Sequence, residues 1–480
     1  MDLAVGFDLD MTLVDSSEGI LATLQRTLSE RGLDVPRDQL WPSMGLPLEL
    51  ILGPYVSEAD LPAAVARYRE LYPTLGVPHT VPMPGAAEAL SAVREMHGRV
   101  VVVSAKFEPA VHAVLDQVGM TADVVVGELF AADKGRALAE HGVGVYVGDH
   151  PGDVAGGLAA GAVAIGVATG PHDKTALRDA GADLVLSSLQ ELPTWLAEHV
   201  LQDRLRGLDD QLRRLGSVLV AFSGGADSAF LLAAAVRALG PDAVAAATAV
   251  SGSLASGELD AAAQFARDLG VRHLKPRTDE LSREGYRANA GDRCFFCKAE
   301  LLDVVGPLAA ELGLAAVATG TNADDAIAGF RPGIRAAAER GAVTPLRDAG
   351  LTKAQVREAS RRWELPTWDK PAAACLSSRI AYGVQITPAG LGRVDRAERA
   401  VRDVLGEAGA DVRDLRVRDL GNERARVELD AGTLDALDAA MRQRVVAAVV
   451  AAGFGEAEID PRGFRSGSMN ELLATPERYR

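Results

Sequence analysis

The chain has 480 residues, of which 48 % are apolar, and its formal net charge is −16. This length exceeds what a single hydrophobic core usually supports, so we predict two or three domains. The negative charge argues against a nucleic-acid partner, because affinity for a phosphate backbone depends on concentrated lysine and arginine. The first residues lack the pattern of a secretory signal, and no apolar run reaches the ~18 residues of a membrane span, so we expect a cytoplasmic protein without a membrane partner.

Residues 1–200 alternate short apolar runs with helical segments, as parallel α/β domains do. The predicted strands are rich in β-branched residues, and they are Leu3–Phe7, Val100–Val103, Asp123–Val126, Val143–Val147, Ala162–Val167 and Asp183–Leu186. Residues 16–82 lack such runs and are predicted to form a helical insertion after the first strand. The helical spacing from Leu189 to Gly216 predicts a closing helix and then an inter-domain helix, with the boundary near Leu201.

Residues 201–386 repeat the strand and helix alternation and are predicted to form a second α/β domain. Beyond Thr387 the sequence pattern changes. Apolar and polar residues alternate in Leu415–Asp419 and in Arg424–Leu429, as they do in antiparallel strands. The predicted fold class is therefore α/β, with two doubly wound parallel-sheet domains and a small α+β appendage over residues 387–480. We assign this appendage to substrate binding or to contacts within a homo-oligomer.

Two carboxylates, Asp8 and Asp10, directly follow the first predicted strand. Ligands of open α/β sheets bind at the carboxyl ends of the strands, so this position is suited to chemistry. One carboxylate can attack a phosphorus atom to form an aspartyl-phosphate while its neighbour delivers a proton to the leaving oxygen. The alternative is a turn whose aspartates cap the next helix.

Further residues along the first domain fit the same chemistry. Attack of one anion on another requires a cation, and Asp149 and Asp153, after the strand Val143–Val147, add carboxylates for Mg²⁺. Ser104 follows a predicted strand and Lys134 begins a helix, and both are predicted to hold phosphoryl oxygens.

These four elements, in this order, resemble the motifs of the haloacid dehalogenase (HAD) superfamily. The resemblance implies a phosphatase with Asp8 as nucleophile and Asp10 as acid/base. It also implies Mg²⁺ held by Asp8, the carbonyl of Asp10 and Asp149, with Asp153 in support, and a helical cap like that of phosphoglycolate-phosphatase-like members. The motifs do not encode the substrate, for which our hypothesis is a nucleotide-like metabolite.

A second phosphate-binding pattern lies between the predicted strand Val218–Phe222 and an apolar helix. Its two glycines let backbone N–H groups close around an anion at the positive end of that helix. The residues predicted to bind ATP are Ser223, Gly224, Gly225, Asp227 and Ser228. The loop lacks the lysine of the Walker A pattern, which disfavours γ-phosphate transfer. It resembles the PP-loop of N-type ATP pyrophosphatases, which adenylate an oxygen and release pyrophosphate; the alternative is a glycine-rich turn without a ligand.

All three cysteines of the chain, Cys294, Cys297 and Cys375, fall within 82 residues. In a reducing compartment, a C-x-x-C pattern is more often metal-binding or catalytic than disulfide-bonded. Three thiolates form an incomplete tetrahedral shell that leaves room for a further ligand. A structural zinc would want a fourth Cys or His, but the last histidine is His273.

Several motifs over about residues 205–475 resemble the LarE family of ATP-dependent sulfurtransferases, which thiolate the pyridinium dicarboxylate precursor of the nickel-pincer nucleotide cofactor. These motifs are Arg293–Lys298, Gly320–Asp325, Lys370–Arg379 and Arg465–Asn470. The resemblance implies that ATP adenylates a substrate carboxylate and that a sulfur nucleophile then displaces AMP to give a thiocarboxylate. Cys375 occupies the sulfur-donor position of the family.

The resemblance leaves the source of the sulfur open. In one branch of the family the cysteine surrenders its own sulfur and is left as dehydroalanine. In another, three cysteines hold a 4Fe-4S cluster that carries a labile sulfide. The full set of Cys294, Cys297 and Cys375 favours the cluster, and a sacrificial Cys375, a zinc site or inert thiols remain as alternatives.

Four charged residues match positions where the family binds anionic substrate, and they are Arg379, Arg416, Arg418 and Glu428. The alternative is that they are salt-bridge partners at the surface. The expected partners are small nucleotide and phosphate substrates.

Two other functions fit the sequence less well. The net charge disfavours tRNA thiolation, and the intact ATP loop disfavours a non-enzymatic iron–sulfur or metal-binding scaffold.

Overall fold

The computed structural model describes residues 3–327, 332–371, 375–410 and 412–465. The chain divides into two compact units, Met1–Val200 and Leu201–Arg480, and each has its own hydrophobic cores. Within the described ranges, no helix is both long enough and apolar enough to cross a membrane. The predicted α/β class with parallel sheets is confirmed.

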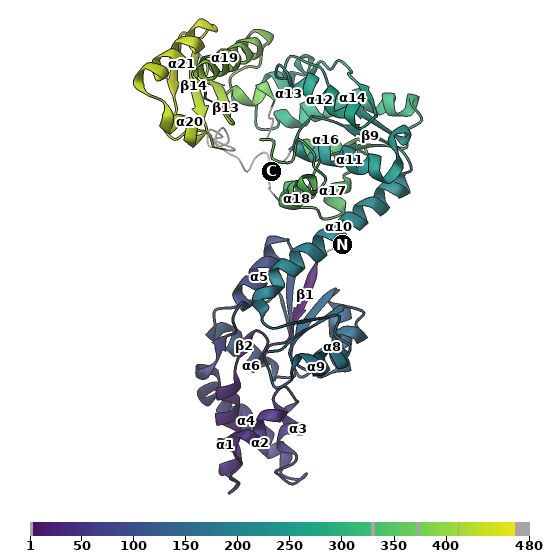
Figure 1. The fold of residues 1–480 in the computed structure, drawn as a ribbon, viewed down its shortest axis with the longest axis vertical. Helices are drawn as coiled ribbons and strands as arrows, with labels where there is room; N and C mark the ends of the chain where they lie inside the picture. Colours follow the sequence, from purple (N-terminus) through teal and green to yellow (C-terminus); the bar gives the residue numbers. More distant parts are fainter. Residues whose placement is uncertain (1–2, 328–331, 372–374, 411, 466–480) are drawn as a thin grey trace. The chain divides into compact units, whose positions relative to one another are not determined.

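The first unit is built on a six-stranded sheet in which all neighbouring strands are parallel (Figure 1). In spatial order the strands are β5 (Val124–Val126), β4 (Arg99–Val103), β1 (Ala4–Phe7), β6 (Val145–Gly148), β7 (Val163–Val167) and β8 (Leu184–Leu186). The helices that follow the strands are α5 (Ala86–Glu95), α6 (Glu108–Gln117), α7 (Ala132–Glu140), α8 (Pro151–Ala159) and α9 (Lys174–Asp179). Successive strand residues face opposite layers, since Val100 and Val102 share a core with α5 whereas Val101 and Val103 share one with α7.

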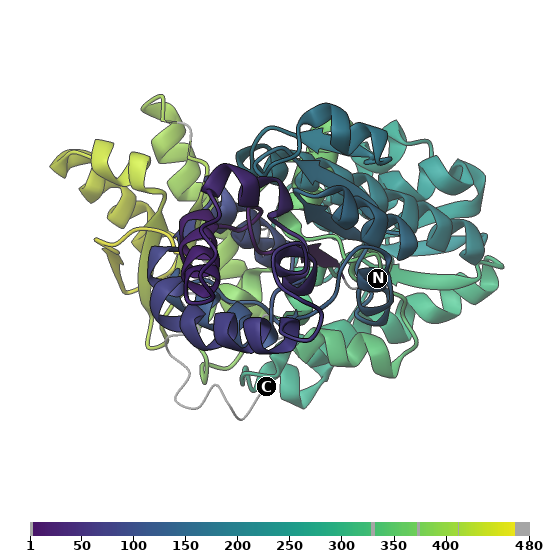
Figure 2. The ribbon, with the colours of Figure 1, turned by 90° about the horizontal axis from the view of Figure 1, so that it is seen from below.

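The insertion after β1 is helical, as its lack of apolar runs predicts. Its helices are α1 (Ser17–Ser29), α2 (Arg37–Leu40), α3 (Leu48–Leu52) and α4 (Leu61–Leu75), and they form one group in both ribbon views (Figures 1 and 2). A short antiparallel pair, β2 (Val14–Asp15) and β3 (Val81–Pro82), joins the two ends of the insertion. Two-residue strands carry no periodic pattern, so the prediction of a strand-free segment missed β3.

The predicted pair of helices between Leu189 and Gly216 is wrong in one respect. A single α-helix, α10 (Leu192–Leu215), runs through this segment after a short 3-10 turn at Leu189–Glu191. Its apolar residues serve both units, because Leu192 and Leu196 belong to a core of the first unit and Leu208 and Leu212 to a core of the second.

The second unit contains a four-stranded parallel sheet in the order β11 (Arg272–Leu274), β10 (Val244–Ala247), β9 (Val218–Ala221) and β12 (Ala316–Thr319). Its longer helices are α11 (Ala226–Leu239), α12 (Glu258–Asp268), α14 (Arg293–Glu311) and α18 (Lys353–Arg362). Shorter ones are α13 (Glu284–Arg287), α15 (Ala323–Ile327), α16 (Pro332–Glu339) and α17 (Pro345–Asp348). The edge strand β11 has no apolar run of its own, and the sequence did not predict it.

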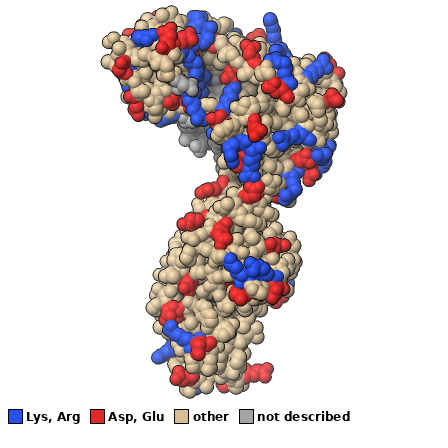
Figure 3. Space-filling model, viewed as in Figure 1, with Lys and Arg blue, Asp and Glu red and all other residues tan. Residues whose placement is uncertain are grey.

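The C-terminal part of the second unit is a small α+β element. Strands β13 (Leu415–Asp419) and β14 (Arg424–Leu429) are antiparallel as predicted, and β15 (Glu456–Ile459) adds in parallel to β14. Its helices are α19 (Pro388–Glu407), α20 (Ala431–Ala436) and α21 (Ala439–Ala451). Lys and Arg side chains gather where this element meets the rest of the second unit (Figure 3).

Candidate active sites of the two units

The first candidate site lies at the carboxyl ends of β1 and β6, which are neighbours in the sheet. Asp8 follows β1, and its backbone N–H donates to the carbonyl of Val147 at 2.8 Å. Asp149 follows β6, and Asp153 lies in the first turn of α8. The parallel arrangement therefore brings together three carboxylates that are up to 145 positions apart in sequence.

Lys134 of α7 lies between two of these carboxylates. Its Nζ is 2.7 Å from Asp8 Oδ1, 2.6 Å from Asp153 Oδ1 and 3.0 Å from the hydroxyl of Tyr146. The lysine side chain is 2 % exposed. Burial and the two carboxylates act oppositely on its pKa, and the carboxylates prevail and raise it well above the ordinary value. Lys134 is therefore a fixed, buried positive charge beside Asp8 and Asp153.

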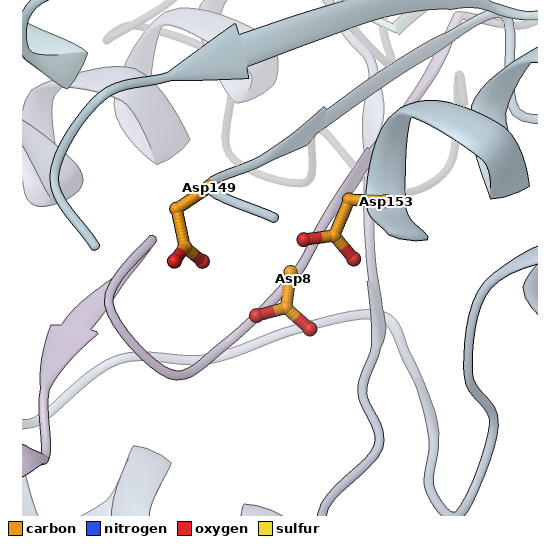
Figure 4. A group of neighbouring side chains, drawn as sticks. All are labelled: Asp8, Asp149 and Asp153. Atoms are coloured by element: carbon orange, nitrogen blue, oxygen red, sulfur yellow. The ribbon is translucent and has the colours of Figure 1, made fainter. Parts of the chain in front are cut away.

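The carboxylates of Asp8, Asp149 and Asp153 can surround a cation (Figure 4). Each offers an oxygen within 4.8 Å of the others, and all three residues are buried. Burial raises the pKa of Asp8 to about 7 against the opposing charge of Lys134, and burial followed by the charges of Asp153 and Asp8 raises that of Asp149. Three negative charges against one lysine leave an excess that a divalent cation would neutralise, so this oxygen-rich set fits the Mg²⁺ that the HAD resemblance implies.

The neighbouring backbone is shaped to leave room for this group. A side chain at Gly170 would collide with Oδ2 of Asp149, and one at Gly148 would collide with the side chain of Asp153. Thr12 adds a hydrogen bond, since its hydroxyl donates to Asp149 Oδ1 at 3.0 Å. Glycine at these two positions therefore lets the backbone lie close to the carboxylates, and hydrogen bonds hold the carboxylates in place.

Asp10 is held apart from the three carboxylates by two contacts of its own. The hydroxyl of Ser16 donates to Asp10 Oδ1 at 2.5 Å, and Nζ of Lys106 lies 3.1 Å from Oδ2. Lys106 also donates to the hydroxyl of Tyr72 in α4 at 3.0 Å, which ties the catalytic loop to the insertion. Sequence reasoning singled out Ser104 but missed Lys106, two residues further along, because its partner lies 96 positions away.

A cavity of about 280 Å³ lies between this site and the helical insertion. Asp8, Asp10, Ser104 and Lys106 line it from the sheet side. The insertion contributes mainly apolar and aromatic residues, which include Ile20, Met44, Ile51, Tyr68 and Tyr72. The insertion thus covers Asp8 and limits the size of a ligand that can reach it.

The second candidate site begins at the loop between β9 and α11. Gly224 has a positive φ of 73°, which favours glycine, and Gly225 precedes the first turn of the 14-residue helix α11. Ser223 and Ser228 lie with their hydroxyl oxygens 3.0 Å apart across the loop. Asp227 Oδ1 is buried and accepts no hydrogen bond from the described residues, so it is free to meet a cation or a ligand donor. The predicted ATP-binding residues therefore form one continuous segment, which comprises the loop after β9 and the first turn of α11.

Lys370 supplies a positive charge to this loop from a distant segment. Its Nζ donates to the carbonyl of Gly224 at 3.0 Å and pairs with Glu258 Oε2 at 2.7 Å. The sequence analysis noted the absence of a Walker-type lysine and placed Lys370 in a motif. It did not predict the contact of Lys370 with the loop, because 146 positions separate it from Gly224. No local signal marks it as a partner of the loop.

A cavity of about 650 Å³ joins the loop to two of the cysteines. Ser223, Gly225, Asp227 and Ser228 line one part of it, together with Lys370. Cys297 and Cys375 line another part, and so do Arg379, Arg402, Arg413 and Arg416. A nucleotide on the loop, a sulfur centre and an anionic substrate can therefore share one space.

The cysteines come from two segments that one arginine holds together. Cys294 and Cys297 lie three positions apart in the first turns of α14, and hence on one face of it. Cys375 immediately precedes a short 3-10 turn, Leu376–Arg379. Arg293 is buried, and its Nη1 donates to the carbonyl of Ser377 at 2.9 Å, which anchors the Cys375 segment to the start of α14.

The three thiols influence one another electrostatically. Burial raises the pKa of the Cys297 thiol well above its ordinary value, and the nearby Cys375, Glu280 and Cys294 raise it further, with Lys298 opposing. Cys294 is exposed, whereas Cys297 and Cys375 are partly buried. A thiolate at Cys297 therefore requires a positive centre beside it, which a metal or cluster would supply.

The sulfur spacing bears on the choice between a zinc ion and a cluster. Thiolates around one zinc at about 2.3 Å would lie about 3.8 Å from one another. Among the described residues, only the three aspartates of the first unit form a group with all ligand atoms within 4.8 Å, so at least one pair of cysteine sulfurs is farther apart. At least that pair of sulfurs is therefore farther apart than the thiolates of one tetrahedral zinc ion would be.

The predicted substrate residues separate into two kinds. Arg379 and Arg416 line the cavity, and the charge of Arg379 adds to burial in lowering the pKa of Arg416 to about 10. Arg418 and Glu428 form a buried ion pair at 2.7 Å and are not among the residues that line this cavity. Arg379 also pairs with Glu398 at 2.9 Å. The expected alternative of solvated surface pairs does not describe these residues, because all of them are buried. Of the motifs noted in the sequence, Ala372–Ala374 and Ser466–Asn470 lie outside the described residues.

Fold and sites together define a chain with one α/β unit that carries a buried acidic site and one α/β unit that carries a glycine-rich loop and thiols. Residues 5–167 match the haloacid dehalogenase-like hydrolase family. A phosphoglycolate phosphatase of Caulobacter vibrioides is 29% identical over 210 residues, which cover 39% of this chain and 88% of that protein.

Two other relatives match more than half of this chain. The pyridinium-3,5-bisthiocarboxylic acid mononucleotide synthase of Lactiplantibacillus plantarum is 34% identical over 263 residues, which cover 55% of this chain and 92% of the synthase. An uncharacterized protein of Synechocystis sp. is 40% identical over 276 residues, which cover 57% of this chain and 99% of that protein. The chain therefore belongs to the LarE family, that of the pyridinium-3,5-bisthiocarboxylic acid mononucleotide synthase, and it carries a HAD-like domain at its N-terminus.

The buried Lys134 leads to a prediction about stability. Lys134→Met leaves Asp8 and Asp153 without their cation, and breaking a buried pair in this way costs about 3–5 kcal/mol. We expect the variant to lower the melting temperature of the first unit in scanning calorimetry without Mg²⁺. The matched control is Arg136→Met, an exposed position on the same helix. Equal melting temperatures for the two variants would contradict the role of Lys134.

Proposed function

We propose that the second unit adenylates a carboxylate of a pyridinium dicarboxylate mononucleotide with ATP and converts it to a thiocarboxylate for nickel-pincer cofactor synthesis. The observation that carries the proposal is the single cavity lined by the ATP loop, Cys297, Cys375 and several arginines. The similarity to the L. plantarum synthase supports the choice of substrate.

The proposed reaction has two steps. A substrate carboxylate oxygen attacks the α-phosphorus of ATP, and the bond to the β-phosphate oxygen breaks to release pyrophosphate. A sulfur nucleophile then attacks the activated carbonyl carbon, and AMP leaves with the original carboxylate oxygen. The loop residues Ser223 to Ser228 hold the phosphates, and Arg379 and Arg416 offer positive charge to the substrate.

We further propose that Lys370 binds the β- and γ-phosphates. In the structure its ammonium group is held by a loop carbonyl and by Glu258, and a polyphosphate can take the place of the glutamate as its partner. This assignment gives the loop the positive charge that its own sequence lacks. It also links ATP binding to the segment that carries Cys375, five positions further along the chain.

Two sources of sulfur fit the three thiols. Cys294, Cys297 and Cys375 would hold a 4Fe-4S cluster, and the chemistry that such a cluster supplies is a labile sulfide. In the alternative, Cys375 gives up its own sulfur. We favour the cluster because all three cysteines of the chain meet near one cavity and a lone sulfur donor would need only one of them.

For the first unit we propose a Mg²⁺-dependent phosphomonoester hydrolase. Asp8 attacks phosphorus, Asp10 gives a proton to the leaving oxygen, and Lys134 and Ser104 hold the phosphoryl oxygens. The cavity of about 280 Å³ lies just below the range of about 300–1,000 Å³ that is usual for ligand pockets, so it favours a small phosphate ester over the nucleotide-like metabolite expected from sequence. The phosphoglycolate phosphatase relative agrees with a small substrate.

The Lys370 assignment is tested by ATP–pyrophosphate exchange and by nucleotide binding. Lys370→Gln removes one charged contact to the outer phosphates, worth about 1.5–3 kcal/mol, so the dissociation constant for ATP should rise about 10- to 100-fold. Binding of AMP, which lacks those phosphates, should change less than twofold. Lys275→Gln, at an exposed position of the same unit, is the control. A parallel loss of ATP and AMP affinity would count against the assignment.

The source of sulfur is tested by anaerobic purification with iron and sulfide analysis, together with the intact mass after turnover. A cluster predicts about four irons per chain, lost in Cys294→Ala even though Cys294 does not line the cavity. Sacrificial chemistry predicts instead that the chain loses the mass of H₂S after one turnover, at Cys375. Protein that contains one zinc and no iron would contradict both.

The phosphatase proposal is tested with Asp8→Asn. Without a nucleophile, hydrolysis of phosphate esters should fall at least about a thousandfold in kcat, because an amide cannot form the aspartyl-phosphate. The panel contains nucleotides, sugar phosphates and 2-phosphoglycolate, each with and without Mg²⁺. Asp179→Asn, an exposed position in α9, is the control. Activity that survives Asp8→Asn would refute the mechanism.

A further inference from the structure

A buried carboxylate, Glu280, faces the cavity that contains the ATP loop and the cysteines. Glu280 is 4 % exposed and lies in the short 3-10 turn Glu280–Ser282. Its Oε1 accepts hydrogen bonds from the hydroxyls of Ser251 and Ser253, both at 2.5 Å. Its Oε2 is also buried, and it accepts no hydrogen bond from any residue that the structure describes.

A buried carboxylate oxygen with no hydrogen-bond partner in the described protein is suited to accept a contact from a ligand. A buried polar atom left without a partner is destabilising, and more so when it is charged. Two hydroxyl donors fix the orientation of the carboxylate through Oε1, so Oε2 keeps a defined position. Glu280, Ser251 and Ser253 all line the cavity of about 650 Å³, which makes a ligand in that cavity the natural partner.

Glu280 is also close to the sulfur site. The backbone carbonyl of Ser253 accepts a hydrogen bond at 2.9 Å from the N–H of Leu376, the residue after Cys375. The hydroxyl of the same serine holds Glu280. The charge of Glu280 is among the causes that raise the pKa of the Cys297 thiol, which places the carboxylate near that cysteine as well.

The other charges that line the cavity from the C-terminal part of the unit are mostly positive. Arg379, Arg402, Arg413 and Arg416 suit the carboxylates and phosphate of a mononucleotide. A carboxylate such as Glu280 would repel those groups. It requires a part of the ligand that is positively charged.

In the substrate proposed above, the positive part is the ring. The carboxylates to be thiolated are attached directly to a pyridinium ring, so a carboxylate that reaches the sulfur site brings the cationic ring with it. We propose that Glu280 is the counter-ion of this ring and that it makes the site prefer pyridinium nucleotides over nucleotides with a neutral ring. This inference rests on the proposed function of the second unit.

The test compares two ligands that differ in ring charge. Nicotinic acid mononucleotide and orotidine 5′-monophosphate both carry a ring carboxylate and a ribose phosphate, but only the first has a cationic ring. Their dissociation constants are measured by calorimetry with the full-length chain. In Glu280→Gln, which keeps an acceptor for Ser251 and Ser253, binding of nicotinic acid mononucleotide should weaken roughly tenfold. Binding of orotidine 5′-monophosphate should change less than twofold.

Two further variants make the comparison specific. Glu280→Asp keeps the charge and should keep the preference for the pyridinium ligand. Glu284→Gln removes an exposed carboxylate four positions away and should change neither constant. Iron content, measured on the same preparations, should be equal in the wild type and in Glu280→Gln.

Several results would overturn the assignment. An equal loss for both ligands would mean that Glu280 has a structural role, and a loss of iron in Glu280→Gln would mean that it is a metal ligand. Pyridinium binding that is unchanged in Glu280→Gln would overturn this inference and leave the proposed function intact. Wild-type protein that binds neither mononucleotide would overturn the proposed substrate class, and the role of Glu280 with it.

Discussion

Parallel strands place all their carboxyl ends at the same edge of a sheet, and both candidate sites of this chain depend on that constraint. In the first unit it brings Asp8 after β1 together with Asp149 after β6. In the second unit it sets the loop after β9 beside Gly320, the residue that follows β12. The backbone of Ser228 lies so close to Gly320 that a side chain at position 320 would collide with it. Residues far apart in sequence thereby reach one edge without any long-range signal of their own.

The buried charged groups show where each site lacks a compensating charge or a hydrogen-bond partner. Lys134 offsets part of the charge of three carboxylates, and the rest calls for a cation. Arg418 and Glu428 form a buried ion pair in which the two charges cancel. Glu280 and Asp227, by contrast, each keep a buried oxygen without a partner among the described residues, and both line the cavity of the second unit. Because an unpaired buried carboxylate is costly, a ligand in this cavity is the natural partner of both oxygens.

The sequence was sufficient for the fold class and for residues that belong to short motifs. Asp8, Ser104 and Ser223 each follow an apolar strand directly, so local pattern and chemistry coincide there. Lys106 was not recognised, and Lys370 and Arg293 were noted only as the first residues of motifs. The contacts of all three are with partners that only the folded chain brings near. The strands β3 and β11 were missed for another reason, since β3 has only two residues and β11 has no apolar run. Single-residue partners and very short strands are products of tertiary packing, which a linear pattern does not contain.

The two sites follow the same electrostatic principle, although their ligand atoms differ. Each gathers like-charged or potentially like-charged ligands in a buried place, where mutual repulsion raises their pKa values unless a positive centre is present. For the oxygen ligands that centre would be a hard cation beside Lys134. For the thiols it would be a softer one, and Lys298 is the nearby positive charge that opposes the rise in the pKa of Cys297. Burial and the neighbouring Cys375 and Glu280 hold Cys297 toward the neutral thiol, so a set of thiolate ligands at this place would depend on a bound positive centre.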